Sequence, residues 1–319
     1  MTQLADLAAP FQRTHQGGYT YGFLDAFAKR ELRRTMLKAI AIPGYQVPYA
    51  SRELPIARGW GTGGLQVTLT LAGPDSTIKV IDQGADDSVN AANLRRFIAR
   101  MTGAATTTDA LAATLIQSRH RIPEERLVEN QVLVLQVPDP EPLRRVQPDI
   151  SQARVMHAEA DYSQMWLTLY EQLVHFGRFM QGASYPSLVH GRYVMSPSPI
   201  PRWDTPKLHQ AAHLTLLSAG REKRLYAIPP YTDVRPLEFD DVFFQVENQA
   251  TWVCRQTGAR YKFMNEIPQE DGSIAYELSD TGYAAKLVAA RAPDGERVTI
   301  GATYYDDEGR FYHAGYLKF

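Results

Sequence analysis

The sequence predicts an α/β or α+β fold, a layered mixed sheet with flanking helices, a helical insertion and a β-rich C-terminal subdomain. Apolar runs of strand length are interleaved with stretches of helical periodicity, which favours helices packed on a sheet. A chain of 319 residues can also bury a sizeable core. Beyond about residue 248 the expected elements are mostly strands, which marks a change of character towards the C-terminus.

Three helices are expected. Residues 24–40 carry apolar side chains at helical spacing. Ser88 is a good N-cap for a second helix. The buried face of that helix would consist of Leu94, Phe97, Ile98 and Met101. Residues 158–180, which are rich in Met, Trp, Tyr and Leu, predict the third helix.

Strands are expected where short apolar or alternating runs are bounded by turn residues. The predicted strands are residues 65–71, 78–81, 131–137, 225–228, 242–246, 261–264 and 274–277. A hairpin of residues 298–305 and 311–317 across the turn 306–309 would end the chain.

Composition excludes several classes of protein. A formal net charge of -1 gives no electrostatic basis for binding nucleic acid or an anionic membrane. Residues 1–10 lack the basic and apolar regions of a signal peptide, and no segment is long enough to span a bilayer. The single cysteine, Cys254, cannot form an internal disulfide. We therefore expect a cytoplasmic protein with no membrane span.

The segment Gly59–Gly64 is dense in glycine and is expected to precede a strand. A phosphate cradle follows a strand and opens a helix, so neither the P-loop nor the Rossmann pattern fits. A tight turn at the start of the strand is the preferred interpretation. The alternative is that Gly61, Gly63 and Gly64 let the backbone approach a ligand closely.

A second candidate site lies in residues 80–90, where a strand passes into a polar loop containing Gln83 and Gly84 and then into a helix. Backbone N–H groups at a helix N-terminus favour anions. The three aspartates of the loop oppose direct phosphate binding unless cations intervene. An anion site and a structural turn both remain open.

A third candidate is His120, which lies between Arg119 and Arg121 beside a predicted strand. The positive neighbours should depress the histidine pKa, which suits a neutral metal ligand or a general base. Arginines also bind phosphate in a bidentate manner. A purely structural histidine is the alternative. His209 and His213 are four residues apart but lack the partners of a zinc site.

Seven long segments together resemble the PhnJ family, the core subunit of bacterial carbon–phosphorus lyase. They are LKAIAIPGYQVP (37–48), RGWGTGG (58–64), KVIDQGADD (79–87), ATLIQSRHRIPE (113–124), QVPDPEPLR (136–144), GRYVMSPSPIP (191–201) and GREKRLYAIPP (220–230). The resemblance implies a PhnJ-like core in residues 1–247, including the helical insertion near 150–190. Residues 248–319 would then be a divergent region in place of the family's iron–sulfur segment.

The resemblance implies a radical S-adenosylmethionine enzyme that cleaves ribose 1-methylphosphonate 5-phosphate into methane and a cyclic ribose phosphate. It implies PhnI-, PhnG- and PhnH-like subunits and an ABC-type ATPase as partners. Gly44 takes the glycyl position of the family. His120 takes the position that meets a metal at the boundary with PhnI, and zinc is the candidate for that metal. The residues expected at the phosphonate or phosphoribosyl pocket are Gly61, Gly63, Gly64, Gln83, Gly84, Arg119 and Arg121.

The sequence departs from the family at the cysteines. Three cysteines of the family hold a [4Fe–4S] cluster and a fourth forms a thiyl radical. These positions are occupied here by Cys254, Thr257, Leu278 and Ala284. One thiolate cannot hold a cluster that needs three, so neither [4Fe–4S] nor S-adenosylmethionine is expected, and Cys254 is at most a weak metal ligand.

Two functions therefore stay open at the level of the sequence. The first is a PhnJ-like subunit that keeps the pocket while radical C–P cleavage is lost or altered. The alternative is a non-catalytic scaffold or phosphonate-binding module that docks PhnI-like and ABC-ATPase partners. Radical lysis with a cluster supplied by another chain is a third hypothesis.

Overall fold

The computed structural model describes eleven ranges of the chain. They are residues 46–48, 62–136, 147–158, 186–189, 192–195, 204–218, 224–236, 251–290, 304–305, 311–313 and 316–317.

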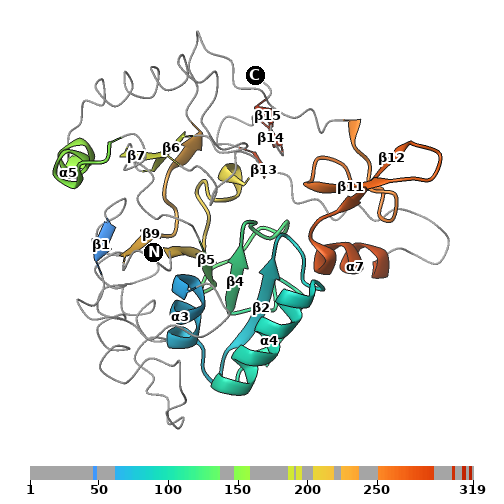
Figure 1. Ribbon diagram of the computed structural model, residues 1–319, viewed down its shortest axis with the longest axis horizontal. Coiled ribbons are helices and arrows are strands. Elements are labelled where there is room, and N and C mark those ends of the chain that lie inside the picture. The colour runs from blue at the N-terminus through green and yellow to red at the C-terminus, as the bar shows by residue number, and fades with distance from the viewer. Residues whose placement is uncertain are drawn as a thin grey trace.

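A seven-stranded mixed sheet forms the centre of the molecule, with the order β1-β9-β8-β5-β4-β2-β3 (Figure 1). Its strands are β1 (Gln46–Pro48), β2 (Thr77–Asp82), β3 (Ala105–Thr106), β4 (Leu115–Arg119), β5 (Val132–Gln136), β8 (Leu214–Ser218) and β9 (Arg224–Ile228). The strands from β3 to β8 pair in parallel, whereas β9 and β1 are antiparallel additions at one edge. The predicted α/β class is confirmed.

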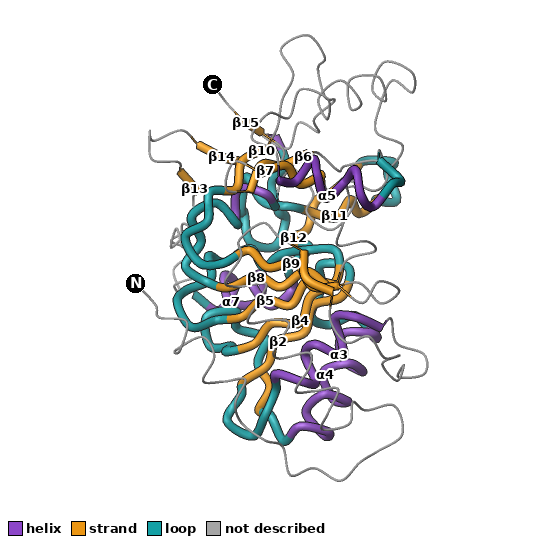
Figure 2. The backbone as a smooth tube through the Cα atoms, turned by 90° about the vertical axis from the view of Figure 1, so that its left-hand side faces the viewer, coloured by secondary structure: helices purple, strands orange, loops and turns teal. Residues whose placement is uncertain are grey.

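Both faces of this sheet are buried, as expected for parallel strands with continuous apolar sequences. Helices α3 (Thr62–Leu71) and α4 (Val89–Thr102) lie on one face, where Val80 and Val134 join the same apolar cluster (Figure 2). The intervening residues, such as Ile81, point to the opposite face and form a second cluster there. Burial on two faces fixes the register, because a shift of one residue would exchange them.

Helix α4 begins and ends as its sequence predicts. The Ser88 hydroxyl accepts a hydrogen bond from the Ala91 N–H at 3.1 Å, and Gly103 ends the helix in the left-handed conformation with φ 72°. Ile98 is fully buried, and Leu94, Phe97 and Met101 pack against the core around it. The prediction of this helix is confirmed.

The strand predicted at residues 65–71 is wrong, because this segment forms helix α3. Its alternating pattern was misleading, since the polar side chains are buried along with the apolar ones and the helix has no solvent face. The polar groups are satisfied internally: Thr70 donates to the Gln66 carbonyl at 2.7 Å, and Thr68 donates to Gln117 of β4. Tertiary burial overrides the local β-propensity.

The expectation that the glycine segment forms a turn before a strand is also wrong. Thr62, Gly63 and Gly64 begin helix α3. A Cβ atom on Gly64 would lie 2.7 Å from Cβ of Gln136, so a glycine is required where the helix meets the end of β5. The segment therefore does open a helix, which is one of the two features of a phosphate cradle that were not expected here from the sequence.

The other elements lie outside the central sheet. They are α5 (Ile150–Ala158), the small sheet β10-β6-β7 (Val234–Pro236, Pro186–Val189 and Arg192–Met195) and the short 3₁₀ helix η3 (Thr205–Lys207). The C-terminal elements are β11 (Met264–Pro268), β12 (Ile274–Leu278), α7 (Thr281–Ala289), β13 (Tyr304–Tyr305), β14 (Phe311–His313) and β15 (Tyr316–Leu317).

The C-terminal strand predictions have mixed outcomes. The strand at 274–277 is confirmed as β12, whereas the one placed at 261–264 begins only at Met264. The hairpin across residues 306–309 is confirmed by the pairing of β13 with β14. Its second arm is not one strand, because the chain reverses after His313 and β15 pairs back onto β14.

Several predicted elements lie outside the described residues. These are the helix at 24–40, the strand at 242–246, and the helix at 158–180 apart from Ala158, where α5 ends. No helix in the described part of the chain has the length and apolar character needed to cross a bilayer.

Leu133 tests the two-sided burial of the sheet. Its side chain is fully buried in β5, so Leu133→Ala should lower the free energy of unfolding by about 2–5 kcal/mol through lost transfer energy and a cavity. Leu111→Ala, at a leucine that is 46% exposed, is the matched control and should change it by less than about 1 kcal/mol. Chemical denaturation of both variants measures the difference, and equal losses would contradict the assigned core.

Candidate functional site

The topology of the sheet indicates a candidate ligand site at the carboxyl ends of β2 and β4. From β2 the chain passes through α4 to β3 on one side, and then returns to β4 on the other side of β2. In open α/β sheets, ligands bind outside the carboxyl ends of the strands where the strand order reverses in this way. The last residues of the two strands, Asp82 and Arg119, are direct partners in the register.

A tight turn follows β2 at this edge. The N–H groups of Asp82 and Ala85 each donate to the carbonyl of the other residue, at 3.0 and 3.1 Å. Gln83 and Gly84 between them have φ values of 52° and 88°, as in a type I′ turn. Gln83 is exposed at the edge, whereas Gly84 is buried. A side chain on Gly84 would collide with the Ser279 hydroxyl.

Arg119 is held against the end of β2 by Asp82. Its Nε and Nη2 lie 2.5 and 2.8 Å from the two carboxylate oxygens, and Asn90 of α4 donates to the same carboxylate at 2.9 Å. The arginine side chain remains 29% exposed. Two of the three aspartates are paired, Asp82 with Arg119 and Asp86 with Lys79, while Asp87 is exposed, so the choice between an anion site and a structural turn stays open.

His120 directly follows β4, is exposed, and has a φ of 75°. Loss of solvent around the imidazole and the neighbouring Arg119 guanidinium lower the pKa of His120, against a smaller opposite effect of Asp82. The shift has the predicted direction, although burial is its larger cause, and it favours the neutral ring. A neutral, exposed imidazole can ligate a metal or accept a proton.

Arg121 has a different environment from Arg119. Its Nε and Nη2 lie 3.0 and 3.2 Å from the carboxylate of the fully buried Asp204, and its guanidinium lies 3.6 Å over the ring of Phe263. Burial acts to raise the pKa of Asp204, but the positive charges of Arg121 and Lys207 outweigh it and hold this pKa below its ordinary value. The geometry thus favours a structural role for Arg121, and ligand binding by it stays a prediction.

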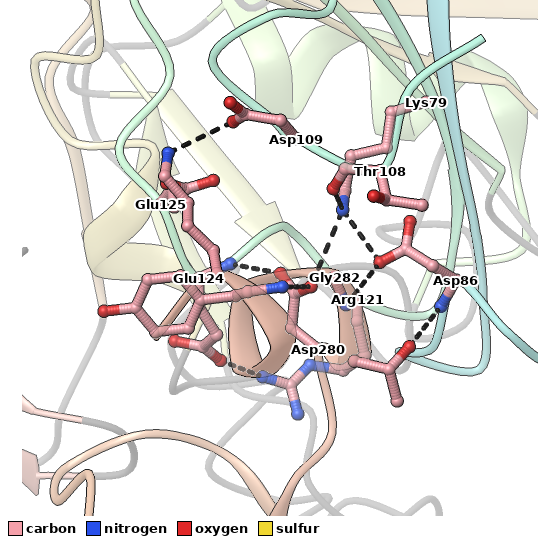
Figure 3. A network of polar contacts seen from close by, with 12 residues as sticks. Lys79, Asp86, Thr108, Asp109, Arg121, Glu124, Glu125, Asp280 and Gly282 are labelled. Atoms are coloured by element: carbon pink, nitrogen blue, oxygen red, sulfur yellow. Dashed lines mark hydrogen bonds and ion pairs between the residues drawn. The ribbon is translucent and has the colours of Figure 1, made fainter. Parts of the chain in front are cut away.

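A buried lysine connects this edge to the C-terminal segment 251–290 (Figure 3). Lys79 of β2 donates to an Asp86 carboxylate oxygen at 2.8 Å and to the Thr108 carbonyl at 2.6 Å, and its ammonium lies 3.6 Å from Asp280. Asp86 also accepts from the Gly282 N–H at 2.9 Å. A buried ammonium is tolerated only with such partners.

A second group of buried charges lies beside the first. Lys207 lies 3.0 Å from Glu124 and 2.9 Å from Asp204, and Lys262 lies 3.8 Å from Glu124. Sequence reasoning missed both groups. The available signal was Lys79 within the otherwise apolar strand TIKVID, because a lysine in a buried strand requires a carboxylate partner.

The four positions that the resemblance assigns to cysteines come together in the structure. Cys254, Leu278 and Ala284 belong to one buried apolar cluster with Met264 and Tyr283. The remaining position, Thr257, is also buried and lies in the turn that begins at Cys254.

This arrangement does not fit a [4Fe–4S] cluster. At the three ligand positions, the Cys254 thiol, the Thr257 hydroxyl and the Leu278 hydrocarbon side chain cannot supply three thiolates. Elsewhere in the described residues, no three His, Cys, Asp or Glu side chains gather as metal ligands. His209 Nδ1 lies 3.1 Å from a carboxylate oxygen of Asp233. Burial lowers the pKa of His213 to about 3.

The remaining predicted site residues are placed only in part. Gly44 and Gly61 lie outside the described residues, and Gly63 lies in the first turn of α3. Gly64 reaches the end of β5, which is the same carboxyl edge that carries Arg119. The structure thus brings Gly64, Gln83, Gly84 and the Arg119–Arg121 segment to the carboxyl edge of the sheet.

Asp86 predicts a pH dependence of stability. Burial, opposed by Lys79 and reinforced by Asp280, raises the pKa of Asp86 from 3.8 to about 6. The folded state therefore binds this proton more tightly than the unfolded state, and the group adds stability as pH falls from about 6 towards 4. Asn mimics the protonated acid, so the stability of Asp86→Asn should not depend on this titration. The free energy of unfolding of Asp86→Asn relative to wild type should therefore be about 1–3 kcal/mol higher at pH 7.5 than at pH 4.5.

Urea unfolding at the two pH values measures this difference. Asp87→Asn, at an exposed carboxylate of the same loop, is the control and should show no such trend. An Asp86→Asn effect that is the same at both pH values would show that the carboxylate titrates normally.

Comparison with known proteins gives a consistent family. The profile described as "Phosphonate metabolism protein PhnJ" matches residues 17–290. The chain is 47% identical over 288 residues to the alpha-D-ribose 1-methylphosphonate 5-phosphate C-P-lyase of Rhizobium meliloti (strain 1021), covering 87% of this chain and 97% of that protein. It is also 47% identical over 275 residues to the lyase of the same name from Escherichia coli (strain K12), covering 86% of this chain and 98% of that protein.

The family profile extends past residue 247 and includes Cys254, Thr257, Leu278 and Ala284. The expected division of the chain after residue 247 stays a prediction. The length of the match and its coverage of both relatives establish the family, and the chain belongs to the PhnJ family of phosphonate metabolism proteins.

Proposed function

We propose that the chain is a subunit of a carbon–phosphorus-lyase-type complex that binds a phosphoribosyl or phosphonate ligand at the carboxyl ends of β2 and β4. The observation that carries the proposal is the Asp82–Arg119 pair at the point where the strand order reverses. The names of the two relatives supply the ligand, alpha-D-ribose 1-methylphosphonate 5-phosphate.

The chemistry of this edge suits an anionic ligand. Asp82 fixes the Arg119 guanidinium in one orientation while leaving the side chain part-exposed, so little conformational entropy is lost on binding. The turn at Gln83 and Gly84 brings backbone close to the same place. The first turns of α3 and α4 contain no acidic residue that would oppose an anion.

The same proposal includes a loss or alteration of radical chemistry. The family's cluster requires three thiolates from the chain, whereas the three ligand positions here are Cys254, Thr257 and Leu278. Leu278 is packed with Met264 and Tyr283 in an apolar core. Ala284, at the radical position, has no sulfur to carry an unpaired electron. A glycine at position 44 cannot replace this machinery.

His120 suits a metal site shared with a partner. It is exposed beside Arg119, and its lowered pKa keeps the ring neutral. One histidine cannot bind zinc alone, so a PhnI-like subunit would have to supply further ligands. PhnG- and PhnH-like subunits and an ABC-type ATPase complete the proposed complex. The alternative, a non-catalytic scaffold or phosphonate-binding module, predicts the same assembly without turnover, and its scaffold form also predicts no ligand binding.

Arg119 provides the test of the ligand site. In the assembled complex, Arg119→Ala should weaken binding of alpha-D-ribose 1-methylphosphonate 5-phosphate by roughly 10- to 100-fold, the value of a charge-assisted hydrogen bond. Isothermal titration calorimetry measures the affinity. Arg96→Ala, at an exposed arginine of α4, is the control and should bind like wild type. A wild-type complex that assembles but does not bind the ligand would favour the scaffold function.

Restoring the thiols tests the cofactor part. After anaerobic treatment with iron and sulfide, wild type should stay colourless, whereas Thr257→Cys/Leu278→Cys should gain broad visible absorption and bound iron, because Cys254 then has two partners. The same double variant with Cys254→Ser has two thiols and is the matched control. Stoichiometric iron and sulfide in wild type would refute this part of the proposal.

A further inference from the structure

We propose that the turn Ser279–Gly282 is a positioning element for the ligand site, with Asp280 as its central residue. The inference rests on the proposed function, because it concerns how the carboxyl edge of β2 and β4 is held ready for its ligand. The turn comes from the C-terminal segment, about 195 residues from the loop it contacts. It would act through other residues and not by touching the ligand.

The loop after β2 is held by this turn at three points. Asp86 accepts from the Gly282 N–H at 2.9 Å and donates its own N–H to the Thr281 hydroxyl at 3.0 Å. Gly84 packs directly against Ser279. This loop begins with Gln83, directly after Asp82 at the end of β2, and Asp82 in turn orients Arg119.

The loop after β4 is held by the same turn and its neighbours. The Glu124 N–H donates to Asp280 Oδ2 at 3.0 Å. Phe263, just before β11, lies under the Arg121 guanidinium. Lys286 of α7 lies 2.6 Å from Glu125. Both loops that carry the candidate ligand residues are therefore fixed by one segment.

Asp280 links these contacts to the start of α7. Its Oδ1 accepts from the Tyr283 N–H at 3.0 Å as the N-cap, while Oδ2 serves Glu124 (Figure 3). The carboxylate also faces the Lys79 ammonium at 3.6 Å. One side chain thus sets the position of the helix, the β4 loop and the buried lysine.

The fit around Gly282 leaves no space for adjustment. A Cβ atom there would lie 2.5 Å from both Asp86 Oδ2 and the Thr108 carbonyl, and 2.9 Å from the Lys79 ammonium. Any side chain at this position must displace the loop after β2, the segment at Thr108 or the turn itself. The C-terminal segment therefore has a positional function that does not depend on thiols, which accounts for a segment that stays docked although three of its four cysteine positions carry no thiol.

Asp280 variants test the proposal in the assembled complex, with two readouts. Asp280→Ala should speed amide hydrogen exchange at least tenfold in residues 82–88 and 119–124, and weaken binding of alpha-D-ribose 1-methylphosphonate 5-phosphate about tenfold. Asp280→Asn keeps one acceptor oxygen, which can cap the Tyr283 N–H, but its amide NH2 cannot accept the Glu124 N–H. It should therefore keep the start of α7 intact while residues 119–124 still exchange faster and ligand binding stays weakened.

Gly282→Ala gives an independent test through the steric fit. It should speed exchange in residues 82–88, although alanine favours a helix. Ala285→Gly, at an exposed position of the same helix, is the matched control. It lowers the helix propensity of α7 without touching the β2 loop, so faster exchange should stay within α7.

The outcomes separate this inference from the proposed function. Faster exchange confined to α7 in Asp280→Ala and Gly282→Ala, with both loops unchanged, would overturn the positioning role. A wild-type complex that binds no ligand, while Asp280→Ala still loosens both loops, would instead contradict the proposed ligand site alone. Equal ligand affinity of Asp280→Ala and wild type, with both loops loosened, would overturn the inference as well.

Discussion

The ammonium of Lys79 is buried in the middle of a parallel strand, and most of the architecture around the candidate site follows from that constraint. A buried cation requires nearby carboxylates and hydrogen-bond acceptors. Asp86 from the following loop, the Thr108 carbonyl and Asp280 from the C-terminal segment supply them. Because these groups come from distant parts of the sequence, satisfying one charge brings the end of β2 and the start of α7 together.

This docking separates two properties that the family combines. The proposed anion-binding edge depends on Asp82, Arg119 and the turn at Gly84, none of which needs a cofactor. The redox function depends on thiols that would lie in the cluster around Leu278 and Tyr283. In this chain apolar packing occupies those positions, so the segment can remain folded and docked by hydrophobic contacts and buried ion pairs alone.

The sequence predicted the elements whose signals are local. Ser88 and the apolar face around Ile98 predicted α4, and the continuous apolar run of β5 predicted a central strand. Helix α3 was missed because Gln66, Thr68 and Thr70 are buried and imitate strand alternation. The approach of Arg119 to the β2 turn was foreseen only as two separate motifs, since their contact depends on strand order. The pairing of Lys79 with Asp280 could not be predicted from spacing, because it spans two hundred residues and depends on tertiary docking.

We propose that this chain retains the ligand site while radical C–P cleavage is lost or altered. The most direct test adds alpha-D-ribose 1-methylphosphonate 5-phosphate, S-adenosylmethionine and a reductant to the anaerobically assembled complex and measures bound ligand and released methane together. The account predicts about one ligand bound per chain and no methane above a blank without protein. Methane released in amounts exceeding the protein would contradict it.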